Sequence, residues 1–491
     1  MSDSAPLVEE LVPAPDPVEA CARLADLPFV VLLDSTTHPD RVGRHTFLTA
    51  DPATVVRSKG ALTQQLGGGR WTRIAADPVA HVGALLEPFA AEPVAGIPPF
   101  QGGGAGYVGY DWGARLERVP RTRYDDLAIP DAMLGLYDWV IAWDHQTEQA
   151  WAISTGIPEQ GAARRERAAR RLSWVKARLD VKRETGNGKR GPLDRDVSRF
   201  SFPVSRAMSA PSYPVPDFPG IRSNFTRAGY LEAAARVIEY VYAGDIFQAN
   251  LSQRLQAPLA GTPFELYRRL RQRNPAPFAA YLDFGQVVVA SSSPERFLRV
   301  DDGRRVETRP IKGTRPRGVG PEHDAALALA LAESDKDMAE NVMIVDLLRN
   351  DLSRVCQPGT VRVPELFALE HYQTVHHLVS TVVGELAPGH DALDLLRAAF
   401  PGGSITGAPK VRAMQIIAEL EPTQRAVYCG SIGYVSITGA LDTSIVIRTY
   451  LVVGRDVYFQ VGGGIVADSD PAQEYRETLD KARGLIAALE P

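Results

Sequence analysis

The sequence predicts an α+β fold with largely antiparallel sheets, and two observations support this. The candidate strands in the second half of the chain occur in hairpin-like pairs, and the candidate helices lie between these groups. The chain has 491 residues, 45% of them hydrophobic and 23% charged. This is an ordinary globular composition, and the length permits several domains of roughly 100–200 residues each.

The first part of the chain, to about residue 180, mixes short β-rich runs with Gly/Pro turns. Residues 28–35 (PFVVLLDS) and 132–144 (AMLGLYDWVIAWD) are its clearest candidate strands. Between them, the glycines of residues 101–112 (QGGGAGYVGYDW) predict a backbone that bends sharply or approaches another segment closely. Residues 165–184 are basic with apolar positions at helical spacing, which predicts a surface helix.

Residues 181–223 are predicted to form a linker or surface excursion, because Gly, Pro, Ser and charged residues dominate much of this stretch. We therefore divide the chain into residues 1–180, 181–223 and 224–491. The last part begins with an amphipathic helix that Thr226 can cap and that ends near Gly244. It continues with predicted strands at 286–292, 306–310, 426–437, 444–453 and 456–464, and predicted helices at 335–352, 393–399, 409–420 and 471–489.

Charge and cysteine usage limit the classes of partner and compartment. The net charge of −5 gives no global attraction to nucleic acid or to anionic membranes. Cys21, Cys356 and Cys429 are scattered and odd in number, which indicates reduced thiols. The acidic, Pro-rich N-terminus does not resemble a signal peptide, and no run approaches the ~18 apolar residues that span a bilayer. These observations predict a cytoplasmic, soluble protein.

Two pairs of carboxylates suggest a cation site. Asp337 and Glu340 lie three residues apart on a helix that Ser334 can cap, and Glu474 and Glu477 lie three apart on the last helix. Residues at i and i+3 share a helix face, so two such faces across a cavity would hold a hard cation, above all Mg²⁺. A solvated acidic surface is the alternative for either pair alone.

Two glycine-rich runs could admit an anion to the backbone. Residues 461–470 (VGGGIVADSD) follow a strand and precede the last helix, and residues 400–410 (FPGGSITGAPK) offer Ser404 before another helix. Backbone N–H groups without side chains beside a helix N-terminus attract anions. A flexible turn is the alternative, and neither run is a dinucleotide or P-loop fingerprint.

Three further residue types could carry chemistry. Lys312 is flanked by Arg309, Arg315 and Arg317, whose charges would lower its pKa and free a nucleophilic amine, unless the loop is simply solvated. His376 and His377 are adjacent in a candidate strand, so they face opposite ways. A partly buried carboxyl such as Glu295, at a strand end, could act as a general acid if its pKa is raised.

Eight motifs, in order along residues 224–481, resemble the chorismate-utilising enzymes. This family includes component I of anthranilate synthase, component I of aminodeoxychorismate synthase, isochorismate synthase and salicylate synthase. The N-terminal part is similar to the same family through LLDS, GRHTFLTADP and QGGGAGYVGYDW. The matching stretches are GDIFQANLSQR, SSSPERFL, TRPIKGTRPRG, DKDMAENVMIVDLLRNDLSRV, YQTVHHLVSTVVGEL, FPGGSITGAPKVRAMQIIAELEP, VYCGSIGYVS and VGGGIVADSDPAQEYRETLDKA.

The resemblance implies two large antiparallel sheets forming a sandwich, with helices on the outside and the N-terminal segment wrapped around the catalytic core. It assigns Mg²⁺ to Glu340 and Glu477, with Asp337 and Glu474 acting through waters. The predicted catalytic residues are Lys312, Glu295 and His377. The predicted contacts to chorismate are Ser404, Tyr428, Arg448, Gly463, Gly464 and Lys481, and the predicted N-terminal amino-acid pocket includes Leu33, Asp34 and Ser35.

Within the family, the lysine of PIKGT resembles aminodeoxychorismate synthases, whereas anthranilate synthases have alanine at the place of Lys312. Enzymes that add water carry a lysine base where this chain has Gln248. The resemblance thus implies that the Lys312 amine attacks C2 of chorismate while Glu295 protonates the departing C4 hydroxyl, and that ammonia then attacks C4. The cysteine contexts fit no glutaminase triad, so a separate glutamine amidotransferase subunit is expected to supply ammonia.

Three alternatives remain open at this stage. The first is component I of anthranilate synthase with Lys312 as an outlier, and the second is one subunit serving both pathways. The third is a non-catalytic amino-acid-binding regulator that uses the LLDS pocket, because that pocket holds tryptophan in some relatives. The complete acidic and glycine-rich set argues against a loss of catalysis.

Overall fold

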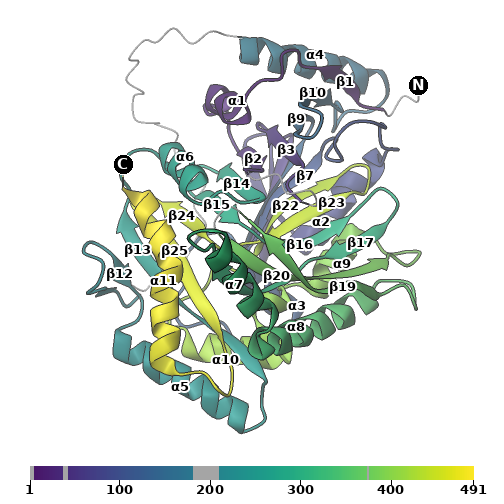
Figure 1. The fold of residues 1–491 in the computed structure, drawn as a ribbon. Coiled ribbons are helices and arrows are strands. Elements are labelled where there is room, and N and C mark those ends of the chain that lie inside the picture. The colour runs from purple at the N-terminus through teal and green to yellow at the C-terminus, as the bar shows by residue number, and fades with distance from the viewer. Residues whose placement is uncertain (1–4, 37–41, 181–209, 373–374, 491) are drawn as a thin grey trace.

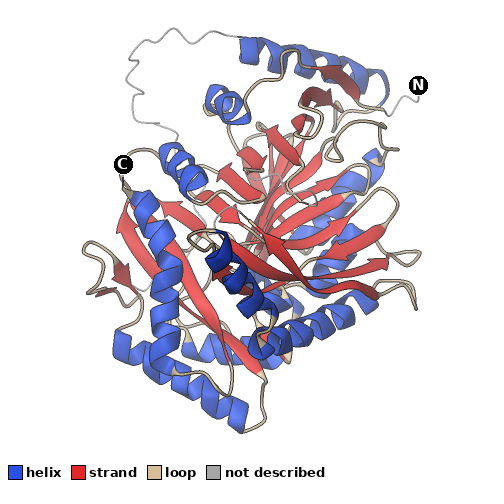
Figure 2. Cartoon of the chain, in the orientation of Figure 1, coloured by secondary structure: helices blue, strands red, loops and turns tan. Residues whose placement is uncertain are grey.

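The fold places two large antiparallel sheets at the centre of the molecule and helices around them (Figures 1 and 2). The computed structural model describes residues 5–36, 42–180, 210–372 and 375–490. The strand pairs of both sheets run antiparallel in this part of the chain. The predicted α+β class with two antiparallel sheets is therefore confirmed.

The first sheet combines strands from both ends of the sequence. Its 13 strands run in the order β1 (Leu7–Glu10), β10 (Gln149–Ser154), β9 (Trp139–Asp144), β3 (His45–Thr49), β2 (Val30–Asp34), β14 (Phe278–Asp283), β15 (Val288–Ser293), β24 (Thr449–Val453), β25 (Asp456–Ile465), β13 (Gln248–Pro258), β12 (Arg222–Ser223) and β11 (Tyr213–Pro214), with β21 (Gly407–Ala408) also paired to β13.

The second sheet is built in the same mixed way. Its 12 strands run in the order β18 (Ile311–Pro316), β20 (Val375–Glu385), β17 (Arg305–Thr308), β16 (Arg296–Val300), β23 (Leu441–Ile445), β22 (Ser431–Ser436), β7 (Gly103–Val108), β8 (Ala132–Tyr137), β4 (Thr54–Lys59), β5 (Leu62–Gly67) and β6 (Arg70–Ile74), with β19 (Arg362–His371) on β20. The N-terminal strands thus complete both sheets. Most of the predicted linker, residues 181–209, lies outside the described residues.

The helices cover the outer faces of the two sheets. They are α1 (Pro17–Leu24), α2 (Pro78–Leu86), α3 (Gly113–Leu116), α4 (Gly161–Asp180), α5 (Arg227–Tyr242), α6 (Pro263–Arg273), α7 (Pro321–Ala332), α8 (Asp335–Ser353), α9 (Ala392–Ala399), α10 (Lys410–Leu420) and α11 (Pro471–Leu489), with short 3-10 turns at η1 (Glu87–Phe89), η2 (Tyr110–Trp112) and η4 (Gly403–Ile405).

Local capping explains where the helices of the catalytic part begin. Thr226, Ser334 and Asp470 each accept a hydrogen bond from the backbone N–H three residues ahead, as N-cap side chains do. Pro471 then occupies the first turn of α11, where its missing N–H costs nothing. The predicted starts of α5, α8 and α11 are confirmed.

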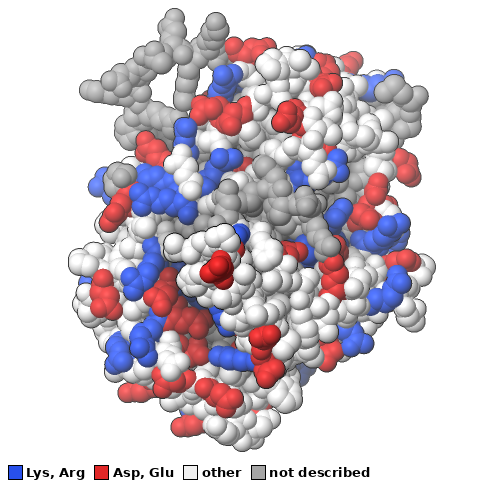
Figure 3. Space-filling view, in the orientation of Figure 1, with Lys and Arg blue, Asp and Glu red and all other residues white. Residues whose placement is uncertain are grey.

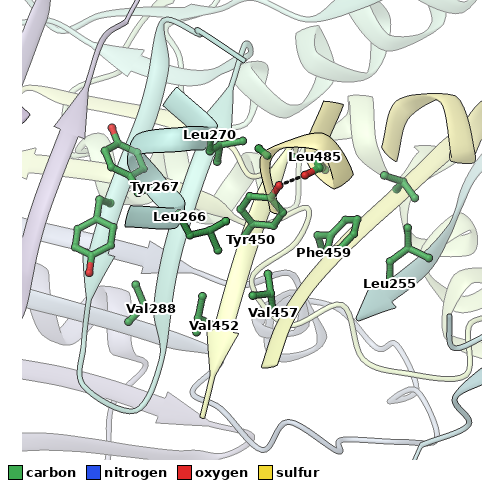
Figure 4. Packing of buried hydrophobic residues seen from close by; sticks show 14 of the residues in the cluster. Leu255, Leu266, Tyr267, Leu270, Val288, Tyr450, Val452, Val457, Phe459 and Leu485 are labelled. Carbon is green, nitrogen blue, oxygen red and sulfur yellow. Dashed lines mark hydrogen bonds between the residues drawn. The ribbon is translucent and has the colours of Figure 1, made fainter. Parts of the chain in front are cut away.

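Four apolar clusters of described residues hold the layers together, and the three larger ones define the layers. One lies between the sheets and includes Phe47, Tyr107 and Val289. A second packs α5, α6 and α11 on the first sheet, where Tyr450 of β24 donates a hydrogen bond to the carbonyl of Leu485 (Figure 4). The third packs α8 and α9 on the second sheet. Helices outside and an apolar layer between the sheets make the fold a sandwich.

The glycine-rich run near residue 100 forms the buried strand β7 rather than a loop. A Cβ at Gly106, where φ is 151°, would lie 2.1 Å from the carbonyl oxygen of Met133 on the neighbouring strand. The predicted close approach of this backbone to another segment is confirmed. Its cause is strand pairing inside the second sheet.

Candidate active site

Glu295 lies between β15 of the first sheet and β16 of the second, where the chain crosses from one sheet to the other. Glu295 is 5% exposed, and its carboxyl accepts hydrogen bonds from the Ser404 side chain of η4 and from the backbone of Ile311. Burial raises the pKa of Glu295 to about 7, against the lowering effect of these contacts. A carboxyl with such a pKa exchanges a proton near neutrality, as a general acid must.

Lys312 lies on β18 with its amine directed toward Glu340 of α8. The distance from Lys312 Nζ to Glu340 Oε2 is 4.0 Å, and the Lys312 side chain is 11% exposed. Burial lowers the pKa of Lys312, although Glu340 and Glu295 oppose this shift. The neutral, nucleophilic amine is thus more populated than in an exposed lysine.

The sequence analysis attributed the lowered pKa of Lys312 to the charges of the flanking arginines, and this cause is wrong. The three flanking arginines each bind a carboxylate: Arg309 pairs with Glu370, Arg315 with Asp337 and Arg317 with Asp324. Their charges are therefore compensated, and desolvation of the amine is the largest cause of the lowered pKa. The direction of the shift agrees with the prediction.

The two adjacent histidines of β20 face opposite ways, as predicted. His377 Nδ1 lies 2.9 Å from Thr314 Oγ1, and its ring centroid lies 5.3 Å from that of Tyr372. His376 instead contacts Asp324, and the distance from His376 Nε2 to Asp324 Oδ1 is 2.9 Å. Burial lowers the pKa of His377 to about 3, so its imidazole is neutral at physiological pH.

The two acidic helix faces meet across a recess. The Lys336 ammonium of α8 is close enough to Glu474 and Glu477 of α11 to affect the pKa of both carboxyls. Figure 3 shows acidic side chains gathered in a hollow between the positions of α11 and α7.

Each of the four carboxylates has a partner. Asp337 accepts from Arg315 at 2.9 Å, Glu340 faces Lys312, Glu474 accepts from Ser469 at 2.7 Å, and Glu477 lies 2.7 Å from Lys481.

These carboxylates fit a hard cation in kind and number. Among residues 5–36, 42–180, 210–372 and 375–490, no group of three or more His, Cys, Asp and Glu side chains is close enough to enclose a metal ion. Mg²⁺ needs no such cage, because it keeps several waters and takes one or two carboxylates together with oxygens of its substrate. Glu340 and Glu477 could supply those two carboxylates from facing helices.

The glycines of β25 separate the acidic recess from a buried amide. A Cβ on Gly463 would lie 3.1 Å from Glu474 Oε2, and Lys481 donates to the carbonyl of Gly462 at 2.9 Å. A Cβ on Gly464 would lie 2.1 Å from Gln248 Nε2. Side chains at either position would crowd these groups, so the glycines let the backbone come close to both.

Arg448 brings a cation to the site, whereas Tyr428 has Arg425 and Cys429 as its neighbours. Arg448, at φ 50°, is partly buried close to Glu295, and its guanidinium has no hydrogen-bond or ion-pair partner in the described part of the chain. Burial raises the pKa of Tyr428 well above its usual value, which keeps the phenol protonated. The Tyr428 ring centroid lies 5.9 Å from the guanidinium carbon of Arg425.

The predicted amino-acid pocket coincides in part with a cavity of about 280 Å³ between the sheets. Leu33 and Asp34 line it, whereas Ser35 is 1% exposed and donates to the carbonyl of Pro277. The Asp34 carboxylate accepts from Tyr267 at 2.7 Å and Arg271 at 2.6 Å. Lys312 does not line this cavity. The binding of an amino acid in the cavity stays a prediction.

Two residues of the site escaped the sequence analysis: Thr314 orients His377, and Asn250 donates to the carbonyl of Ser404 at 3.1 Å. Arg315 was considered only as a charge near Lys312, and its contact with Asp337 was not predicted. Strand alternation from Gln248 could have indicated Asn250. It could not have indicated Thr314, because the pairing register of β18 shifts between Ile311 and Thr314.

Comparison with known proteins identifies the family of the chain. The family described as chorismate binding enzyme matches residues 31–487. The chain is 42% identical to aminodeoxychorismate synthase component 1 of Salmonella typhimurium, over 100% of both chains. It is 41% identical to anthranilate synthase component 1 of Thermus thermophilus, over 96% of this chain and 95% of that protein.

The fold has a solved counterpart as well. Anthranilate synthase component I from Streptococcus pneumoniae superposes with a TM-score of 0.75 at 31% identity, covering 90% of this chain and 92% of the other. Across the described residues, no helix is both long and apolar enough to cross a bilayer. The family match covers most of the chain and includes every predicted catalytic and metal-binding residue, so the chain belongs to the family of chorismate binding enzymes.

Proposed function

We propose that the chain is an aminodeoxychorismate synthase component I, which converts chorismate and ammonia to 4-amino-4-deoxychorismate on the route to folate. The observation that carries this proposal is the buried amine of Lys312, beside the carboxyl of Glu295 with its pKa of about 7. A nucleophile and a general acid in one pocket suit a substitution in which a hydroxyl leaves. Chorismate is the substrate class of the family.

The residues suggest a double displacement. The neutral Lys312 amine attacks C2 of chorismate, the two conjugated ring double bonds shift, and the C4 hydroxyl leaves as water with the proton of Glu295. Ammonia then attacks C4, the double bonds shift back, and the Lys312 amine leaves C2 as a neutral amine. The new C4 ammonium group gives a proton to the Glu295 carboxylate, which restores the acid. Nitrogen thus reaches C4, whereas direct attack by ammonia at C2 would lead toward anthranilate.

Anthranilate synthase component I is the second candidate. Overall similarity does not separate the two functions, because identity is 42% to an aminodeoxychorismate synthase component 1 and 41% to an anthranilate synthase component 1. Lys312 favours the first function, since an amine in the pocket would compete with ammonia for C2. Mass and NMR analysis of the product from chorismate, Mg²⁺ and ammonium distinguishes the two candidates.

Mg²⁺ is proposed as the cofactor, held by Glu340 and Glu477, with Asp337 and Glu474 acting through waters. When bound, the cation supplies positive charge for the ring carboxylate of chorismate, which would otherwise face an acidic recess. Arg448, which lacks an ion-pair partner among the described residues, suits the enolpyruvyl carboxylate, together with the backbone of Gly463 and Gly464 and the Tyr428 hydroxyl. Ser404 and Lys481 complete the polar lining.

Ammonia is proposed to come from a separate glutamine amidotransferase subunit in the cytoplasm. A glutaminase nucleophile must be an accessible cysteine with a lowered pKa. Cys21, Cys356 and Cys429 are free and buried. Burial raises the pKa of Cys356 to about 11 and of Cys429 to about 12, and it raises that of Cys21 further.

The purified chain is expected to form product with ammonium and to form none with glutamine alone. Adding a glutaminase subunit should restore the glutamine-dependent reaction, because that subunit supplies the missing thiolate. Product and released glutamate are measured together by chromatography. Glutamate release by the isolated chain would contradict the two-subunit assignment.

The pH profile tests Glu295 as the general acid. Its protonated fraction falls as pH rises through about 7, so kcat/KM for chorismate should decline above that pH. Ser404 lowers the pKa of Glu295 by a hydrogen bond, so Ser404→Ala should move the decline to higher pH. Glu295→Gln should lower the rate about 10²–10⁴-fold, the usual contribution of a general acid, and remove the decline. If kcat/KM of Glu295→Gln still declines above pH 7, the decline belongs to the titration of another group.

A further inference from the structure

Arg425 is a fully buried arginine in the connection between α10 and β22. Its side chain is 1% exposed, and its charge is balanced by Glu421, whose side chain is 2% exposed. Arg425 Nε donates to Glu421 Oε2 at 2.9 Å, and Arg425 Nη2 donates to Glu421 Oε1 at 2.7 Å. A buried ion pair adds little net stability, because both charges lose their hydration. Its place in the fold therefore suggests a role besides stability.

Two further hydrogens of the Arg425 guanidinium bind backbone carbonyls. Nη1 donates to the carbonyl of Ile405 at 3.0 Å, and Nη2 donates to the carbonyl of Asn250 at 2.7 Å. Ile405 belongs to η4, and Asn250 belongs to β13. The donors of a guanidinium are fixed in one planar fork, so this side chain holds η4 against β13.

The residue between these contacts is Ser404, whose side chain is hydrogen-bonded to the Glu295 carboxyl. The carbonyl of Ser404 accepts from the Asn250 side chain at 3.1 Å. The backbone N–H of Asn250 donates to the carbonyl of Thr406 at 2.8 Å. The η4 turn is therefore tied to β13 at three successive carbonyls, those of residues 404, 405 and 406, and Arg425 contributes to this tie.

Aromatic rings and a second strand fix the orientation of Arg425. Its guanidinium carbon lies 4.6 Å from the ring centroid of Tyr110 and 5.9 Å from that of Tyr428, within the range of cation–π attraction. The carbonyl of Arg425 accepts from Gln460 of β25 at 3.1 Å. A side chain that positions a reacting group must itself be held in this way.

We propose that Arg425 is a positioning residue for the general acid, because it fixes η4 so that the Ser404 hydroxyl stays directed at the Glu295 carboxyl. The inference rests on the proposed function of Glu295. The hydrogen bond from Ser404 lowers the pKa of Glu295 against the effect of burial. Loss of the contacts that Arg425 makes should therefore change the titration of Glu295, and not only the stability of the fold.

The test is the pH profile of kcat/KM for chorismate consumption by Arg425→Lys. Lysine keeps a positive charge beside Glu421 but lacks the fork that reaches both carbonyls. We expect the decline above pH about 7 to move upward by about one pH unit, the effect of losing one hydrogen bond to a charged group. Arg57→Lys, the same substitution at a buried arginine of β4, is the matched control and should leave the profile unchanged.

A double variant decides whether Arg425 acts through Ser404. The hydrogen bond to Glu295 is already absent in Ser404→Ala, so adding Arg425→Lys should shift the profile no further. An unchanged profile in Arg425→Lys, or an equal shift in the Ser404→Ala background, would overturn the proposal. If Arg425→Lys does not fold, Arg425→Gln combined with Glu421→Gln, which leaves neither charge of the pair unpaired, is measured in the same way.

Failure of the proposed function is a separate result. Chorismate consumption is measured whatever the product is, so the pH profile does not depend on where nitrogen is added. The proposed function fails if the wild-type chain makes a product other than 4-amino-4-deoxychorismate, whereas the role of Arg425 fails only on the profiles of the variants.

Discussion

Lys312→Ala is expected to abolish formation of 4-amino-4-deoxychorismate. The substitution removes the amine proposed to attack C2 and leaves Glu295, Ser404 and Arg448 in place, so chorismate should still bind. Ammonia could then reach C2 directly, and His377, which is neutral because burial lowers its pKa to about 3, could accept the C2 proton. Some anthranilate should therefore form in place of the usual product. Chromatography of the products with ammonium as the nitrogen source measures both compounds.

A matched variant separates the nucleophile from its charge. Lys312→Arg keeps a cation near Glu340, whose Oε2 lies 4.0 Å from the present amine, but arginine stays protonated and does not attack carbon. This variant should be as inactive as Lys312→Ala. Intact-mass analysis of the quenched wild-type reaction should reveal a chorismate-derived adduct that both variants lack. Undiminished product from Lys312→Ala would show that the lysine contributes only charge, and the covalent route would have to be abandoned.

The sequence was sufficient where local chemistry decides the structure. The caps at Thr226, Ser334 and Asp470 and the apolar periodicity of the helices that follow predicted the start of α5, α8 and α11 correctly. The raised pKa of Glu295 was also predictable, because an acidic residue directly after a run of buried strand residues has little access to water. The antiparallel class followed from strands that occur in pairs.

The sequence was insufficient where distant segments meet. The arginines near Lys312 bind Glu370, Asp337 and Asp324, partners that lie 61, 22 and 7 residues away from them along the chain. Nothing in the loop itself indicates these pairs, so the cause of the lysine's lowered pKa was misassigned. The carbonyls that Arg425 binds likewise belong to residues 20 and 175 positions away from it along the chain.

Loss of the cation site should have the other large effect. Glu340→Gln is expected to lower turnover by about 10²–10³-fold, the usual cost of losing one charged group that stabilises a reacting species in a buried site. EDTA should abolish wild-type activity, and added Mg²⁺ should restore it. The physical reason is repulsion, because a dianionic substrate would approach four carboxylates. The cationic side chains of Lys312, Arg315 and Lys481 each face one of these carboxylates already.

Glu340→Gln could slow the reaction through loss of Mg²⁺ or through a changed pKa of Lys312, and these two causes must be distinguished. Losing the Glu340 charge also removes an influence that raises the pKa of Lys312, so the amine would become more neutral, and this alone should not slow its attack. Calorimetric titration with Mg²⁺ in the presence of chorismate therefore provides the second measurement, and Glu340→Gln should weaken Mg²⁺ binding as well as turnover. Asp346→Asn, an exposed carboxylate on the same helix paired to Arg349 at 2.8 Å, is the matched control and should change neither. Full activity of Glu340→Gln in the presence of EDTA would rule out the metal assignment and leave Lys312, Lys336 and Lys481 as the cations that neutralise the substrate.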